Sequence, residues 1–124
     1  MSRLWIILGA LAGLTGVALA AAGAHAFAPR IGPAGMETLR SATNLQLIHA
    51  LALVLSGVWA ERATTRRPLI HAAGLCFALG IVGFSGAIHA LVLAGIRLPA
   101  IAPTGGTLLM LGWLLVGLAA LRRG

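Results

Sequence analysis

The stretch ALAAAGAHAFAPRIG, residues 18–32, decides how the chain is built. Two small-x-small endings, at residues 18–20 and 24–26, close an apolar run, as they do in a secretory signal. That run is long, because no charged residue occurs over the 25 residues 4–28, whereas a signal has an apolar region of about 7 to 15 residues and about 20 residues cross a bilayer. We therefore expect a retained transmembrane helix with His25 near its far end.

The composition is that of an integral membrane protein. Of 124 residues, 60% are hydrophobic and only 9% are charged, and the mean hydropathy is +1.01. The net charge of +7 comes from arginines that stand at the ends of apolar runs. Such arginines indicate membrane topology and not a nucleic-acid partner. The single cysteine, Cys76, lies in an apolar run, excludes an intrachain disulfide and predicts a packing role.

Charges and prolines divide the chain into four apolar runs, at about residues 4–28, 44–60, 69–96 and 104–121. The predicted fold is all-α: a single integral membrane four-helix bundle spanning residues 1–124. Residues 29–43 and 62–68 are expected to be connections.

The arginines predict the orientation of these helices. Six of them lie on the side of the termini and of the 62–68 turn: Arg3, Arg62, Arg66, Arg67, Arg122 and Arg123. Three lie on the other side: Arg30, Arg40 and Arg97. Because cytoplasmic loops carry the excess of basic residues, we expect both termini in the cytoplasm and a multi-pass protein of the bacterial inner membrane.

Small residues recur at helical spacing and predict close helix packing. In the first run, glycines and one alanine follow one another three or four residues apart, and further glycines occur in the third and fourth runs. The expected packing positions are Gly9, Gly13, Gly16, Gly23, Gly83, Gly86 and Gly112. They predict a tight bundle that also packs against a second copy or a larger membrane complex.

Histidines inside the spans are the main candidates for a site, since ionisable residues are costly in a bilayer. His25 and His89 each lie 21 residues from the cytoplasmic ends of their helices, or about 31 Å. His49 lies about 20 Å from Arg62. The predicted outer-leaflet polar cluster comprises His25, Gln46, His49, Ser85, His89, Thr104, Gly105 and Gly106. Free N–H groups at residues 104–106, at the expected helix start, could bind an anion or a carbonyl.

Two functions for this cluster stay open. In one, each histidine bonds a backbone group and fixes the outer end of a structural or accessory subunit that has no enzymatic activity and no cofactor. In the other, two facing histidines hold a b-type haem, or the cluster serves a quinone, in a redox module. A metal site is not expected, because no HxxxH or HExxH spacing occurs. A carboxylate-driven proton pump is not expected, because no aspartate or glutamate lies in a span.

Four motifs, in order along the chain, carry a family resemblance: GAHAF at 23–27, LQLIHALALVLSG at 45–57, GIVGFSGAIHAL at 80–91 and APTGGTLLMLGWLLVG at 102–117. Together they resemble the YgdD-like inner-membrane proteins, domain of unknown function 423, with relatives called transmembrane protein 256. The resemblance covers nearly the whole chain and implies a compact four-helix membrane protein, without implying a biochemical activity. Where the family usually has a tyrosine, this chain has His89, so His25 and His49 are the better candidates for a ligand role.

Overall fold

The computed structural model describes residues 1–122 and is helical, with no strand in that range. The elements are α1 (Ser2–Ala22), η1 (Gly23–Phe27), α2 (Ala28–Arg62), α3 (Arg67–Gly80), η2 (Ile81–Ser85), α4 (Gly86–Ala94) and α5 (Ile101–Leu121). The two η segments are π-helical. The predicted all-α class is confirmed, and Arg123 lies outside the described residues.

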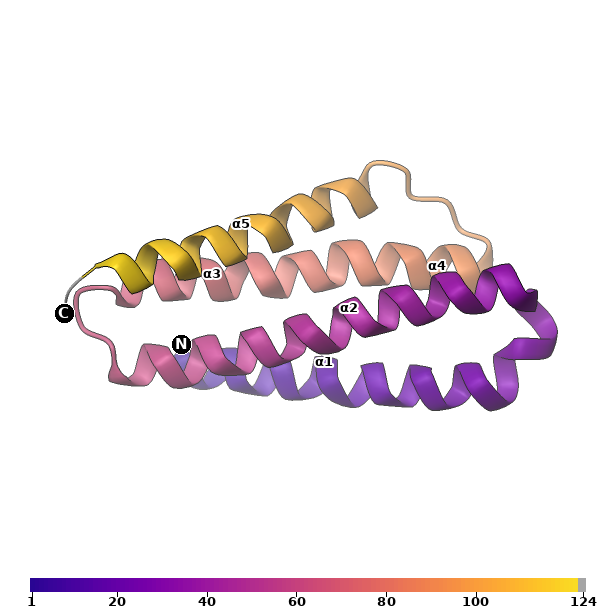
Figure 1. Ribbon diagram of the computed structural model, residues 1–124, viewed down its shortest axis with the longest axis horizontal. Coiled ribbons are helices and arrows are strands. Elements are labelled where there is room, and N and C mark those ends of the chain that lie inside the picture. The colour runs from indigo at the N-terminus through magenta and orange to yellow at the C-terminus, as the bar shows by residue number, and fades with distance from the viewer. Residues whose placement is uncertain (123–124) are drawn as a thin grey trace.

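The first helical run folds back on itself at Gly32, which has φ 70° and ψ −179°. Only glycine adopts such a backbone without strain. Beyond it, α2 runs antiparallel to α1 (Figure 1), so that Gly9 lies against Val54 and Gly57 lies against Ile6. In both places an added Cβ would come within 2.6 Å of the neighbouring side chain, so the two backbones lie close together.

The prediction of a connection over residues 29–43 was wrong, because helix resumes directly after Gly32. Pro33 stands in the first turn of the resumed helix, where its missing N–H costs no hydrogen bond. Leu39, Ala42 and Thr43 are already buried. The charges between residues 30 and 40 therefore mark the end of the hairpin and not a loop.

The second half of the chain forms another hairpin. Helix is continuous from Arg67 to Ala94, and it ends at Gly95, which takes the left-handed φ of 70° typical of a glycine C-cap. Helix α5 returns alongside it, and Gly105 lies against the backbone of Gly83. The expected boundaries at 69–96 and 104–121 are close to those observed, although α5 begins three residues earlier, at Ile101.

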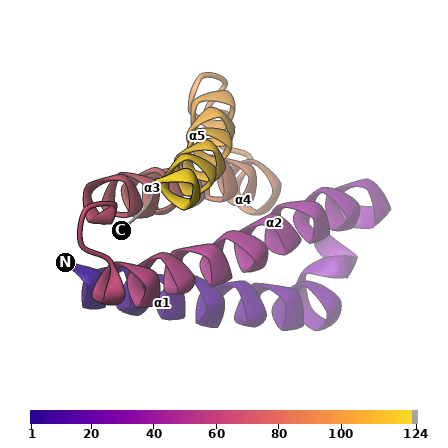
Figure 2. The same cartoon turned by 60° about the vertical axis from the view of Figure 1, so that its left-hand side comes forward.

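The helices pack in series and do not close into a ring. Helix α1 packs chiefly on α2, α2 packs on α3, and α5 packs on α3 and η2 (Figure 2). A core of Trp5, Leu53, Phe77, Ile81 and Leu109 joins the layers. Helices α1 and α3 make few contacts apart from those of Trp5, so a groove remains between them.

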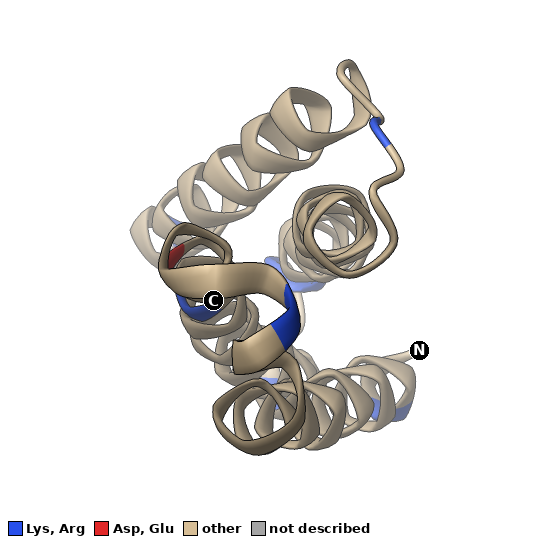
Figure 3. Ribbon diagram, turned by 90° about the vertical axis from the view of Figure 1, so that its right-hand side faces the viewer, with Lys and Arg blue, Asp and Glu red and all other residues tan. Residues whose placement is uncertain are grey.

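The start of α1 and the end of α5 lie at one end of the molecule, together with the turn between α2 and α3 (Figure 1). Figure 3 shows the basic residues in blue, one of them on the loop between two helices. At the terminal end, Arg67 donates from Nε to the Ala60 carbonyl oxygen at 3.1 Å, and the Arg66 guanidinium lies 5.4 Å from the centre of the Trp59 ring. Three helical runs, Ser2–Arg62, Arg67–Ala94 and Ile101–Leu121, are long and apolar enough to cross a membrane.

Candidate functional site

His49 joins α2 to α5 through a hydrogen bond from Trp113. The indole Nε1 donates to His49 Nε2 at 3.0 Å, and His49 Nδ1 lies 2.7 Å from the Leu45 carbonyl oxygen. An indole can only donate and a carbonyl can only accept, so His49 is neutral with its hydrogen on Nδ1. The Phe77 ring lies 5.9 Å from His49 and 5.3 Å from Trp113. Both ring nitrogens of His49 are thus engaged within the protein.

A second tryptophan–histidine pair joins α1 to α3. Trp5 Nε1 donates to His71 Nδ1 at 2.8 Å. The indole is buried and covers Gly74, where an added Cβ would lie 2.9 Å from the ring. Neither pair was predicted from the sequence. A tryptophan in an apolar run has an N–H that needs a partner, and this signal could have found them.

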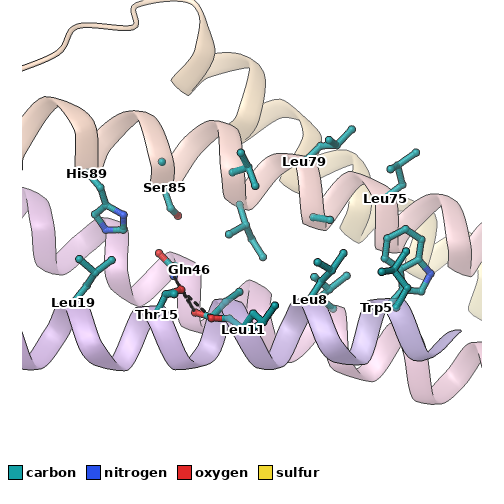
Figure 4. Close-up of a pocket in the computed structure, with 17 residues that line it drawn as sticks. Trp5, Leu8, Leu11, Thr15, Leu19, Gln46, Leu75, Leu79, Ser85 and His89 are labelled. Atoms are coloured by element: carbon teal, nitrogen blue, oxygen red, sulfur yellow. Dashed lines mark hydrogen bonds between the residues drawn. The ribbon is translucent and has the colours of Figure 1, made fainter. Parts of the chain in front are cut away.

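The groove between α1 and α3–α4 has a volume of about 730 Å³ and a polar end (Figure 4). Leucines of both helices line most of it, and the polar end is formed by Thr15, Gln46, Ser85 and His89. Gln46 Nε2 donates to the Ala12 carbonyl oxygen and to Thr15 Oγ1, both at 2.9 Å.

The other two polar residues of the groove have weaker partners in α2. Ser85 Oγ donates to the Ala42 carbonyl oxygen at 3.5 Å. His89 Nε2 lies 3.5 Å from Thr43 Oγ1. Both distances are at the long limit of a hydrogen bond, so these groups keep much of their capacity for another partner.

The predicted cluster is only partly assembled: Gln46, Ser85 and His89 meet in the groove, whereas His49 belongs to the Trp113 contact. His89 lies beside Thr43, six residues before His49, which is about 9 Å along α2. His25 does not join the predicted cluster. It is exposed in η1 and has no hydrogen bond among the described residues. The prediction failed because depth along a helix does not determine the direction of a side chain.

The expected role of residues 104–106 as a helix start was also wrong. Since α5 begins at Ile101, these residues lie inside the helix, and Thr104 bonds back to Ala100 through both its amide, at 3.4 Å, and its hydroxyl, at 2.7 Å. Gly105 instead allows contact with the backbone of Phe84. Gly106 has only ordinary contact with the Phe84 ring, at 3.6 Å.

Five of the seven expected packing glycines are in close contact, since an added Cβ at each would come within 3.1 Å of a neighbouring helix: Gly9, Gly16, Gly23, Gly83 and Gly112. The other two do not pack. An added Cβ at Gly13 or Gly86 would meet no atom within 4 Å. The small residues of α1 therefore serve two faces, one against α2 and one that is open.

Two of the histidines are bonded to tryptophans, which makes them poor candidates for haem ligands. His49 has no free nitrogen, and His71 lies with Trp5 far from His89 along the same helix. Within residues 1–122, no three His, Cys, Asp or Glu side chains gather in a group that could hold a metal ion.

Comparison with known proteins identifies the family of the chain. A family model described as protein of unknown function, DUF423, matches residues 19–106. The chain belongs to this family. It is 38% identical to a UPF0382 membrane protein of Staphylococcus aureus, with 97% of both chains covered. It is 37% identical to one of Staphylococcus haemolyticus, with 92% of both covered. The UPF0382 inner membrane protein YgdD of Escherichia coli is 33% identical, with 98% of this chain and 92% of YgdD covered.

No solved structure matches the chain significantly. The family model covers the polar end of the groove at Gln46, Ser85 and His89, whereas Trp5 and Trp113 lie outside the matched residues. Relatives are membrane proteins of unknown function, which agrees with the predicted membrane location and offers no support for the redox alternative.

Proposed function

We propose that this DUF423 protein is a four-span, non-catalytic inner-membrane protein that acts by packing against another membrane protein. Four spans follow if the hairpin at Gly32 divides the run from Ser2 to Arg62. The part before Gly32 is about 45 Å long and the part after it is about the same. Each exceeds the roughly 30 Å hydrocarbon thickness of a bilayer, so each can cross it alone.

The arginines support an orientation with both termini in the cytoplasm. Among the described residues, the helix bounds place Arg3, Arg62, Arg66, Arg67 and Arg122 toward the terminal end, and only Arg30, Arg40 and Arg97 toward the other. This asymmetry agrees with the positive-inside rule.

The observation that carries the packing role is the open face of α1. Gly13 has no atom near it, and Ala10, Val17 and Ala20 on the same side of the helix are exposed. Glycine in a helix costs about 1 kcal/mol relative to alanine, and at Gly13 the fold gains no internal contact from it. Small residues on an outer face let a second helix approach closely, which is how helices associate in membranes.

Site-specific photo-crosslinking in native membranes tests this role. A photoreactive residue at Val17, beside Gly13, should give a discrete cross-linked protein, whose mass tells a second copy from a different protein. The matched position is Leu118 on α5, which is also exposed and should yield lipid adducts only. Gly13→Leu should abolish the product, whereas Gly117→Leu, at another glycine with no neighbour within 4 Å, should not. Lipid adducts alone at Val17 would refute the proposal.

A further inference from the structure

We propose that the groove between α1 and α3–α4 binds a neutral lipid whose head carries a hydroxyl group. This inference goes beyond membrane packing and does not depend on it, because Gly13 does not line the groove. It rests on the shape of the groove, on one polar atom without a partner and on the absence of charge.

The groove is buried at its floor and open at its rim. The floor includes Trp5, Leu53 and Ile81, which are buried, while Leu79 and Val82 at the rim are 50% and 73% exposed. Its wall on α1 runs from Leu4 to Leu19, which is about 22 Å along the helix. A lipid chain can therefore enter sideways from the bilayer and lie along the helices. The volume is within the range of ligand sites, about 300 to 1,000 Å³.

The amide of Gln46 presents an unpaired oxygen to the groove. The Ala12 carbonyl can only accept a hydrogen bond, so the amide nitrogen must face it and the oxygen must face away. Gln46 is only 5% exposed, and Oε1 has no hydrogen-bond partner among the described residues. Figure 4 shows this oxygen turned toward the side of Ser85 and His89. An acceptor in an apolar groove that lacks a donor costs free energy, so a ligand that donates a hydrogen there is favoured.

His89 offers the second polar group. Its Nε2 is near Thr43, and its other ring nitrogen has no partner within residues 1–122. A hydroxyl both donates and accepts, so it can donate to Gln46 Oε1 and accept from an imidazole N–H. A quinone carbonyl accepts only and would leave Gln46 Oε1 unpaired.

The lining of the groove indicates a neutral head group. No Asp, Glu, Lys or Arg is among the residues that line it. A phosphate or carboxylate would be buried there without a counter-charge, at a large cost. The ligand chemistry is therefore that of a lipid alcohol, either a glyceride or an isoprenoid alcohol.

Photolabelling of the full chain in nanodiscs tests the site. The probe is a long-chain alcohol that carries a diazirine in its tail, compared with its methyl ether and with the matching fatty acid. We expect the alcohol to label the peptides that contain Leu11 and Val82 and the other two probes to label them about tenfold less, as expected when a buried hydrogen bond is lost or a charge is buried. Unlabelled diacylglycerol and farnesol, added separately, show which kind of alcohol competes better.

Two variants in the groove and one control variant outside it test whether the labelling depends on this site. Gly86 lines the groove, and an added Cβ there meets no atom within 4 Å, so Gly86→Leu should occupy the groove and abolish the labelling. Gln46→Leu should lower labelling about tenfold, and Gly117→Leu outside the groove should leave it unchanged. The proposal is overturned if the ether or the fatty acid labels as strongly as the alcohol, if a quinone competes better than both alcohols, or if labelling of folded Gly86→Leu equals that of the wild type.

Discussion

The contact between His49 and Trp113 gives a quantitative prediction for stability. His49→Phe keeps an aromatic ring beside Phe77 but removes the acceptor for the indole N–H. Trp113→Phe removes the donor and leaves His49 Nε2 without a partner. Each change should lower the free energy of unfolding by about 1 to 3 kcal/mol, the cost of leaving a polar group unsatisfied.

In the His49→Phe variant, the exposed position of Trp113 does not give its indole N–H another hydrogen-bond partner. Its side chain is 47% exposed, yet in a bilayer that surface faces acyl chains, which accept no hydrogen bond. In the double variant neither unsatisfied group remains. The loss should therefore be smaller than the sum of the single losses by about 0.6 kcal/mol, the average measured for polar contacts between membrane helices, and by at most about 1.7 kcal/mol.

Equilibrium unfolding in mixed micelles gives the free energy of unfolding of the wild type, the two single variants and the double variant. The control is His25→Phe, which changes an exposed histidine of η1 without a hydrogen bond and should shift the free energy of unfolding by less than about 0.5 kcal/mol. A coupling between His49 and Trp113 below about 0.3 kcal/mol would equal simple additivity. It would show that the hydrogen bond contributes nothing and refute the reasoning.

Three further predictions follow from close approaches and from topology. Gly105→Ala should lower the free energy of unfolding by about 3 kcal/mol because the added Cβ meets the backbone of the adjacent helix. The neighbouring Gly106→Ala should change it by less than about 0.5 kcal/mol. Thermal unfolding in detergent compares the two variants, and equal losses of stability would contradict the packing. Gly74→Ala should cost about 1 to 3 kcal/mol by pressing on the indole that covers it, measured in the same assay. In a background lacking the native cysteine, Thr64→Cys should be protected from an impermeant maleimide in intact cells and Pro99→Cys should react; reaction of both would refute the proposed span count or orientation.

The sequence was sufficient for the fold class because a bilayer imposes its thickness on every span. The sequence shows four apolar runs. The boundaries of three of these runs are close to those of the observed helices. The first reversal, at Gly32, lies within the predicted connection, but that connection was predicted too long because Arg30, Glu37 and Arg40 have the composition of a loop. At a membrane boundary the same residues can stay helical, and the backbone of Gly32 decided the turn.

Which side chains come together was harder to predict from the sequence than the depth of each residue in the membrane. Gln46, Ser85 and His89 line one groove, and the signal for this was that they are polar residues at similar heights on neighbouring helices. His25 and His49 do not line this groove, since their direction depends on helix rotation. Each of the two π-helical segments, at residues 23–27 and 81–85, winds more residues into a turn than an α-helix does and changes that rotation.

The serial packing of the helices has a consequence for how the chain assembles. Helices α1 and α2 form one local hairpin and α3 to α5 form another, and most contacts lie within each hairpin. Each can therefore form soon after its two helices leave the insertion machinery, with docking of α2 on α3 as the later step. Under mild denaturation we expect the hairpins to separate before either comes apart, so that amide hydrogens facing the α2–α3 interface exchange before those between α1 and α2.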